Sequence, residues 1–377
     1  MNKFIEQLLI FIFLNIRNDY KDNYDYYRFG LKPEKRLTLK QKIKQKIIKL
    51  INGKFINLNI KKINDLDVET YIQSVYILLP YYKGFYDLYN KLKNQESQDL
   101  LIRLLVYRIL GANKVKLPLN TSKYWEGIIK IKKLENINDY LEVPFVGDKN
   151  LRLNKYDLSK INIPIEIYSW AGLYTYSDLG QYFYKKGDVI IKPQLNDIVL
   201  DCGACWGDTT LYFAHKVGKA GHVYSFEFLP ANIDVFNKNI KLNKNLSERI
   251  TLVQNPLSSI SDQKVSYYEN GPGSSIKQDF INDSSSAKTV TIDDFISKKQ
   301  VEVDFIKMDI EGSEMDALKG AEKTIRKFKP KLAISIYHSL DDFVNIPKWI
   351  TELNLGYMLY LEHYTIHNEE TVIYAKV

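Results

Sequence analysis

The chain has 377 residues, of which 45% are hydrophobic and 26% are charged, and its formal net charge is +8. This length accommodates more than one well-packed domain, and the composition excludes a disordered or fibrous chain. The basic stretches at 32–49 and 130–133 carry no interleaved aromatic pattern, so we expect solvated helix faces and no nucleic-acid partner.

The N-terminal region, 1–115, is predicted to be mainly helical. Its first stretch, 1–16, is apolar but too short to span a bilayer, and no small-residue cleavage site follows it. Glu6 and Gln7 interrupt the apolar run, which favours an amphipathic helix that packs on the rest of the chain or on a partner. We therefore expect no transmembrane segment. The chain could also form a homo-oligomer through these helices.

Two more helices are predicted in this region from apolar residues at helical intervals. The first covers 65–79, where Pro80 should end or kink it. The second covers 95–111, with Gly111 as its stop signal.

The connecting region, 116–192, has a mixed pattern, with short strands expected around 165–170. The aromatic-rich stretch 172–186 is expected to lie beside the glycine-rich loop described next. The loop 271–276, G-P-G-S-S-I, would either close over the same site or form a plain surface turn.

A buried strand, a glycine-rich loop and the start of a helix follow one another over 197–209. The strand ends at Asp201, and Gly203 and Gly207 let the backbone turn sharply and a ligand approach closely. The loop lacks the G-x-G-x-x-G spacing of a dinucleotide site, and Asp208 puts negative charge where a pyrophosphate would bind. A carboxylate before the loop suits an amine, and S-adenosylmethionine carries an ammonium and a sulfonium but no phosphate.

The next predicted strand, 222–228, ends near Glu227, about 20 residues after the loop, where a carboxylate would accept hydrogen bonds from both ribose hydroxyls. We therefore predict S-adenosyl-L-methionine as the cofactor. The expected cofactor-binding residues are Asp201, Gly203, Ala204, Gly207, Asp208, Thr209, Glu227, Asn255 and Asp309.

Strands and helices alternate from Asp197 onward, which predicts a mostly parallel, doubly wound α/β sheet. The expected strands are 197–203, 222–228, 250–255, 303–309, 331–337, 357–363 and 371–377. The expected helices are 208–217, 230–242, 313–328 and 342–354. The link 364–370 is too short for a crossover helix, so the last two strands should form an antiparallel hairpin. This seven-stranded pattern predicts the Rossmann-like fold of class I methyltransferases over 193–377, preceded by the helical region.

The stretch 304–314, D-F-I-K-M-D-I-E-G-S-E, begins as a buried strand and ends in acidic residues. Asp309 and Glu311 should lie over the cofactor at the carboxyl edge of the sheet. Glu314 would either join them or cap the helix that starts near Ser313.

Three stretches of the sequence resemble the FkbM family of S-adenosylmethionine-dependent methyltransferases. They are V-L-D-C-G-A-C-W-G-D-T-T, Y-S-F-E-F and I-K-M-D-I-E-G-S-E-M-D-A-L-K-G-A, and the resemblance runs from about Tyr156 to the C-terminus. It departs from the family at Cys202, where an aliphatic or small residue is more usual. The resemblance implies O-methyl transfer, commonly to a sugar hydroxyl of a polyketide, capsule, lipopolysaccharide or other glycan, and thus a small-molecule or glycan substrate.

An alcohol acceptor has to lose its proton, so a base within hydrogen-bond reach assists the reaction. The candidate catalytic residues are Asp309, Glu311 and His338, and His338 is apt because its ordinary pKa lies near neutrality. His363 is a weaker candidate. Asp309, Glu311 and His338 could also bind a metal ion, but their spacing does not require one, and we predict none.

Other functions stay open at this point. A nicotinamide-dependent nucleotide-sugar oxidoreductase or epimerase is disfavoured by the missing G-x-G-x-x-G. A nucleic-acid methyltransferase is suggested only by Asn255-Pro256-Leu257, which follows the third strand and lacks the second proline and the aromatic residue of that motif. A non-catalytic scaffold conflicts with the intact Asp201 and Glu227. Cys202 and Cys205 have the C-x-x-C spacing of a redox pair or half a zinc site, but no second pair exists to complete a zinc site, and packing within the glycine-rich loop is favoured. Because nothing suggests a disulfide framework, a reducing compartment and a cytoplasmic protein are expected.

Overall fold

The structure is a computed structural model that describes residues 2–29, 65–145, 149–170, 180–268, 275–277 and 286–377. Three of the stretches discussed above fall partly or wholly outside these ranges. They are the basic stretch 32–49, residues 172–179 of the aromatic-rich stretch, and residues 271–274 of the glycine-containing loop.

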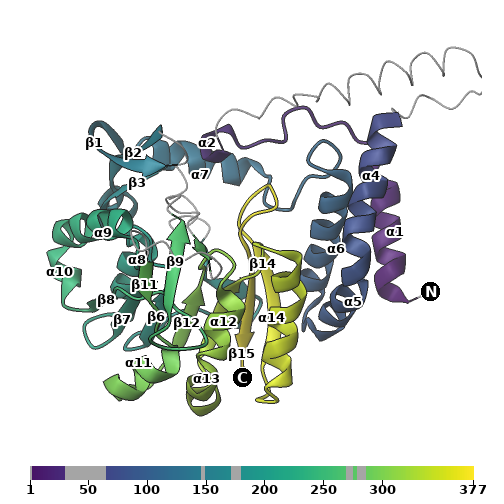
Figure 1. The fold of residues 1–377 in the computed structure, drawn as a ribbon. Helices are drawn as coiled ribbons and strands as arrows, with labels where there is room; N and C mark the ends of the chain where they lie inside the picture. Colours follow the sequence, from purple (N-terminus) through teal and green to yellow (C-terminus); the bar gives the residue numbers. More distant parts are fainter. Residues whose placement is uncertain (1, 30–64, 146–148, 171–179, 269–274, 278–285) are drawn as a thin grey trace, which may run out of the picture.

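The main sheet has seven strands within the described residues, in the order β14-β15-β13-β12-β6-β7-β8 (Figure 1). The strands are β6 (Ile198–Cys202), β7 (His222–Phe226), β8 (Ile250–Val253), β12 (Phe305–Met308), β13 (Lys331–Ser335), β14 (Met358–His363) and β15 (Thr371–Lys376). β15 lies between β13 and β14 and is antiparallel to both, whereas the remaining neighbours pair in parallel. All seven predicted strands and the antiparallel hairpin are confirmed.

The helices between the strands are α8 (Asp208–Val217), α9 (Pro230–Leu242), α10 (Lys244–Ser247), α11 (Ile292–Lys299), α12 (Glu314–Lys319), α13 (Glu322–Phe328) and α14 (Leu340–Glu352). The helices predicted at 208–217, 230–242 and 342–354 correspond to α8, α9 and α14, whereas α10 and α11 were not predicted. The single helix expected over 313–328 is wrong, because it is divided into α12 and α13 at Gly320. A Cβ at Gly320 would lie 2.2 Å from the carbonyl oxygen of Ser258, so the backbone approaches this loop closely.

The described parts of the N-terminal region are mainly helical, as predicted. Their elements are α1 (Lys3–Asn15), α2 (Tyr26–Phe29), α4 (Asp65–Leu78), the 3₁₀ helix η1 (Leu79–Tyr81), α5 (Tyr82–Lys91) and α6 (Gln95–Leu110), and α7 (Ser122–Lys132) follows in the connecting region. α4 gives way to η1 next to Pro80, and α6 stops at Gly111, where φ is +79°. α1 packs on α6, while its outer residues Leu9 and Phe13 are exposed, and oligomerisation through this face stays a prediction.

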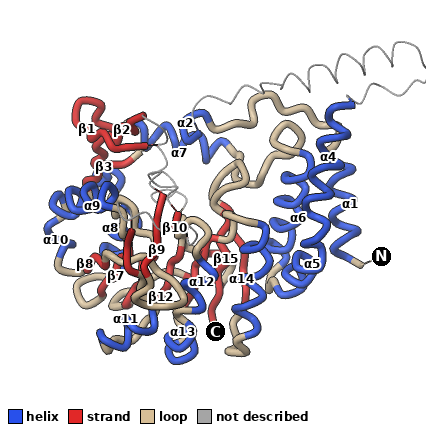
Figure 2. The backbone as a smooth tube through the Cα atoms, in the orientation of Figure 1, coloured by secondary structure: helices blue, strands red, loops and turns tan. Residues whose placement is uncertain are grey.

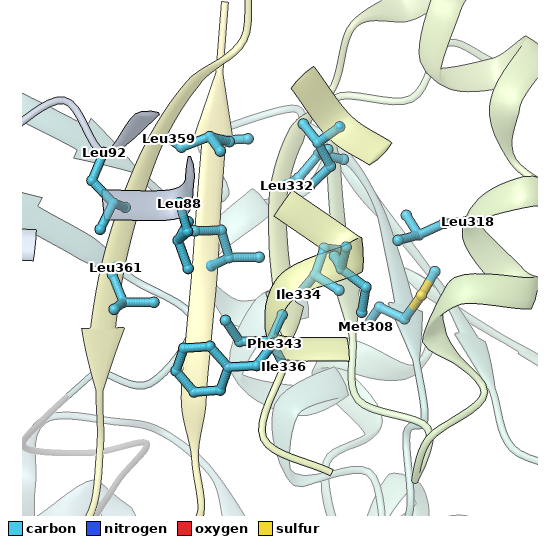
Figure 3. Close-up of a cluster of buried hydrophobic side chains, with 14 of the residues drawn as sticks. Leu88, Leu92, Met308, Leu318, Leu332, Ile334, Ile336, Phe343, Leu359 and Leu361 are labelled. Atoms are coloured by element: carbon cyan, nitrogen blue, oxygen red, sulfur yellow. The ribbon is translucent and has the colours of Figure 1, made fainter. Parts of the chain in front are cut away.

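The N-terminal helices share one hydrophobic core with the main sheet. Figure 3 shows Leu88 and Leu92 beside Leu359 and Leu361 of β14, with Phe343 of α14 close by. The link between α5 and α6 adds to the edge of the sheet, because Leu92 forms a parallel bridge with Leu359. The helices therefore cover the β14 edge.

Smaller antiparallel sheets surround the main one (Figure 2). They comprise β1 (Glu135–Phe145), β2 (Lys149–Asp157) and β3 (Glu166–Ser169); β4 (Tyr184–Lys186) and β5 (Val189–Ile191); and β9 (Lys264–Tyr268), β10 (Ser275–Lys277) and β11 (Ser286–Lys288). A short 3₁₀ helix, η2 (Leu158–Ile161), follows β2. β3 confirms the strand expected near 165–170, and it is fixed to α9 because Asn239 Oδ1 accepts the Tyr168 amide at 2.8 Å.

Among the described residues, none of the helices has the length and apolar character needed to span a membrane.

Candidate functional site

The glycine-rich loop after β6 is held against the ends of the two neighbouring strands. The amides of Gly203 and Ala204 donate to the carbonyl of Phe226 at 3.1 and 2.9 Å. Gly203 and Gly207 have φ values of +85° and +84°, which favour glycine. A Cβ at Gly203 would lie 1.9 Å from the carbonyl oxygen of Asp309, so this turn accepts no larger residue.

The side chain of Asp201 stabilises this loop through buried contacts. Its carboxylate is fully buried, lies 3.1 Å from Nζ of Lys307, and accepts hydrogen bonds from the hydroxyls of Thr209 and Thr210 at 2.9 and 2.6 Å. Nζ of Lys307 also donates to the carbonyl of Gly203 at 2.6 Å. The Asp201 carboxylate is therefore already engaged and lines neither cavity described below, and its expected contact with the amine of the cofactor stays a prediction.

One cavity, here called the Glu227 cavity, lies where β6, β7, β8 and β12 end. It is lined by Glu227, by Asn255 and by apolar side chains that include Phe226, Leu257 and Ile310. Glu227 is fixed because it accepts the amides of Phe228 and Leu229 at 2.7 and 2.9 Å and the side-chain amide of Asn232 at 3.2 Å. Burial raises the pKa of Glu227.

The donor set of the Glu227 cavity fits the adenosine part of the predicted cofactor. Its apolar walls suit a planar base, and the Glu227 carboxylate retains lone pairs for ribose hydroxyls. The same arrangement opposes a pyrophosphate, since Glu227 and Asp208 would both lie near its negative charge.

The D-I-E-G-S-E motif forms a tight loop beyond β12. The fully buried carboxylate of Glu314 accepts the amides of Ile310 and Gly312 at 2.7 and 2.9 Å. Glu311 and Gly312 have φ values of +55° and +92°, so two successive residues are left-handed. Glu314 thus shapes the loop that precedes α12, and Glu311 lines both this cavity and the next.

His338 lies among carboxylates at the end of β13. Its Nδ1 is 3.1 Å from Oε1 of Glu314, and its Nε2 is 3.3 Å from Oδ1 of Asp309 and 3.5 Å from Oε2 of Glu311. Burial acts to lower the pKa of His338, but these carboxylates outweigh it and raise the pKa to about 11. A pKa raised this far favours the protonated imidazole at neutral pH, which suits His338 less well to accept a proton, and its role as a base stays a prediction.

A second cavity, here called the Asp208 cavity, adjoins the first. Its lining includes Asp208, Thr209, Lys307, Asp309 and Glu311. Burial raises the pKa of Asp208 to about 6. Asp309 accepts the hydroxyl of Tyr182 at 2.6 Å and that of Tyr337 at 3.3 Å, so the described end of the aromatic-rich stretch does reach the site.

The predicted site residues therefore occupy three kinds of position. Those that line the Glu227 cavity are Gly203, Glu227, Asn255, Asp309 and Glu311, and those on the Asp208 cavity include Asp208 and Thr209. Ala204 and Gly207 shape the loop through their backbone. Asp201 and His338 act through other side chains, and His363 is buried against Thr371 and the carbonyl of His367, away from both cavities.

Several cavity residues escaped the sequence prediction. The sequence could have pointed to Lys307, because it is a lone lysine in an apolar strand and a buried lysine needs a carboxylate partner. Arg28, Trp170 and Glu370 carried no such signal, because they reach the cavity from segments far apart in the sequence.

Ligand atoms of Asp309, Glu314 and His338 lie within 4.8 Å of one another, close enough for a cation. Their charges already compensate one another, since the protonated imidazole lies between carboxylates. We assign no metal to this cluster.

The strand order, the glycine-rich loop after β6 and the acidic residue after β7 define a class I S-adenosylmethionine-dependent methyltransferase. The family comparison agrees, because residues 201–359 match the model described as the methyltransferase FkbM domain. This domain of the chain therefore belongs to the FkbM methyltransferase family, and S-adenosyl-L-methionine is its cofactor.

Solved structures of methyltransferases are similar at low identity. The FkbM methyltransferase from Methylobacillus flagellatus is 20% identical with a TM-score of 0.49, and the match covers 80% of this chain but only 60% of that one. Aeropyrum pernix fibrillarin, solved with natively bound S-adenosyl-L-methionine, is 15% identical with a TM-score of 0.32, covering 48% of this chain and 67% of that one. No match was found among curated protein sequences.

Proposed function

We propose that the protein transfers the methyl group of S-adenosylmethionine to a hydroxyl of a sugar, in a precursor of a surface glycan, capsule or lipopolysaccharide. The observation that carries this proposal is the position of Glu311, which lines the Glu227 cavity and the Asp208 cavity at once. When bound, the cofactor supplies an electrophilic methyl group on a sulfonium. The chain has to position the acceptor and remove its proton.

Glu311 is the best candidate for the base. Its side chain keeps 30% of its surface exposed, and burial raises its pKa, so it is a stronger base than an ordinary glutamate. Asp309 is less suited, because two tyrosine hydroxyls already donate to it. The His338 imidazole lies 3.3 Å from Asp309 and 3.5 Å from Glu311 and so holds both side chains in place.

Charge at the site disfavours the other enzyme classes. Asp208, Asp309 and Glu311 line the Asp208 cavity, and a nucleic-acid phosphate would be repelled there. Asp208 also opposes the pyrophosphate of a nicotinamide cofactor. An acceptor hydroxyl, by contrast, gains a hydrogen bond from a carboxylate.

The test starts with calorimetric titration of S-adenosylmethionine and of NAD into the full-length protein. We expect binding of the first only, and Glu227→Ala should weaken it. Methyl transfer to sugar nucleotides and glycans is then compared between wild type, Glu311→Gln and the exposed control Glu302→Gln. Glu311→Gln should lower kcat by about 10²- to 10⁴-fold with cofactor affinity retained, since it removes the base but not the cofactor cavity. Unchanged turnover would remove Glu311 from the mechanism.

A further inference from the structure

The N-terminal segment returns to the site through a series of buried contacts. After α1, the side-chain amide of Asn23 donates to the carbonyls of Ala112 and Val115 at 2.7 and 2.8 Å. The fully buried Asp25 then accepts the hydroxyl of Tyr124 at 2.6 Å. Figure 1 shows this segment ending at α2, beside α7.

Asp25 also fixes the short helix that follows it. Its Oδ1 accepts the amides of Tyr27 and Arg28, both at 3.0 Å, and its own amide donates to Nε2 of His367 at 3.0 Å. These bonds hold the backbone of Arg28 against the turn between β14 and β15. The side chain of Arg28 therefore enters the Asp208 cavity from a fixed position.

Inside that cavity Arg28 forms an ion pair with Glu370, and Glu370 also accepts the side-chain amide of Gln181. The Arg28 and Glu370 side chains are only 9% and 12% exposed. Neither belongs to residues 201–359, which match the FkbM domain. Part of the cavity lining is thus supplied by parts of the chain outside the family domain.

The charges on this cavity restrict what it binds. Its described carboxylates are Asp208, Asp309, Glu311 and Glu370. The cations among its described lining residues are Lys307, which is paired with Asp201, and Arg28, which is paired with Glu370. An anionic acceptor would have to break one of these pairs and face the carboxylates, which costs free energy in a buried site.

Trp170 supplies an apolar surface on the same cavity. It is partly exposed and packs edge-to-face on Trp206, with ring centroids 6.4 Å apart and an interplanar angle of 76°. A pyranose ring has apolar C–H faces and polar hydroxyl edges. A partly exposed indole beside an arginine–carboxylate pair complements both features.

We propose that the acceptor enters the Asp208 cavity as an uncharged sugar ring, an inference that rests on the proposed function. The Arg28–Glu370 pair binds its vicinal hydroxyls, with the guanidinium donating and the carboxylate accepting, and Trp170 contacts one face of the ring. Arg28 is thereby a specificity-determining residue, and the N-terminal segment is part of the acceptor site.

The experiment uses full-length protein saturated with S-adenosylhomocysteine, so that no turnover occurs. Methyl glycosides of glucose, mannose and rhamnose are titrated and followed by saturation-transfer NMR, alongside the methyl glycoside of glucuronic acid. We expect at least one neutral glycoside to bind and the glucuronide to bind about tenfold more weakly. Arg28→Gln should weaken the neutral glycoside by about tenfold, and Arg28→Lys should weaken it less because the charge remains.

Two controls separate the possible failures. Arg17→Gln alters an exposed arginine at the start of the same segment and should change nothing. S-adenosylhomocysteine affinity, measured for every variant, should stay at the wild-type value, which shows that the cofactor cavity is folded. If S-adenosylhomocysteine does not bind to the wild-type protein, the proposed function itself is refuted. With it intact, tighter binding of the glucuronide, no binding of any neutral glycoside, or an unaffected Arg28→Gln variant would each overturn the acceptor assignment.

Discussion

At the scale of single residues, the site depends on buried charges that compensate one another. Lys307 and Asp201 are 3% and 0% exposed, and their pair joins β12 to β6 while Lys307 also donates to the carbonyl of Gly203 in the loop. Burial acts to lower the pKa of Lys307, but Asp201 and Asp309 outweigh it and raise the pKa. Removing either partner would leave an uncompensated buried charge, so this pair specifies the loop geometry more than it adds stability.

His338 leads to a prediction on pH dependence. Its folded pKa of about 11 lies above the unfolded value of about 6.5, so the protonated imidazole stabilises the folded state. This contribution is complete below about pH 6.5 and is lost as the pH rises towards 11. His338→Gln should therefore cost most near pH 6.5 and progressively less at higher pH, as measured by urea unfolding over this range.

His222→Gln is the matched control, because burial lowers the pKa of His222 and leaves it neutral in both states above neutral pH. The stability difference between wild type and this variant should be independent of pH there. A pH-independent cost for His338→Gln as well would mean that the imidazole is uncharged in the folded protein.

At the scale of elements, the sequence predicted best where burial and periodicity agree. Strands such as β12 are buried on both faces and therefore appear as apolar runs. The β1–β2 hairpin was missed because β1, E-N-I-N-D-Y-L-E-V-P-F, contains a proline and is mostly polar over residues 135–139. The Glu227 and Asp309 positions were predictable because each directly follows its strand, whereas Arg28 and Glu370 meet only through tertiary structure.

The break between α12 and α13 yields an element-scale prediction. Gly320 has an ordinary backbone conformation, but a Cβ there would lie 2.2 Å from backbone oxygen of Ser258. Because a carbonyl cannot rotate away as a side chain can, Gly320→Ala should destabilise the protein by about 1–3 kcal/mol. The adjacent exposed control, Lys319→Ala, should change the free energy of unfolding little. An equally small effect of Gly320→Ala would show that the backbone at residues 258–259 can move aside at little cost in free energy.

At the scale of the whole molecule, the hydrophobic core crosses the boundary expected between the helical region and the catalytic domain. Phe85 of α5 packs edge-to-face on Phe343 of α14, with centroids 5.7 Å apart. On the edge strand β14, the amide of Leu361 donates to Ser97 Oγ at 2.9 Å. The sequence could not predict this continuity, since amphipathic patterns identify a buried face but not its partner.

This continuity predicts that the methyltransferase domain does not fold independently. A fragment of residues 193–377 would expose Phe343, Leu359 and Leu361, which are at most 1% exposed in the full chain, and would leave the β14 edge open to pairing. We expect it to aggregate or to bind a hydrophobic dye, while full-length protein unfolds in one calorimetric transition. A fragment of residues 65–377 is the control, because it retains α5 and α6 and should stay folded. Native-like near-ultraviolet circular dichroism and cooperative unfolding of the 193–377 fragment would contradict the prediction and make the helices a separate domain.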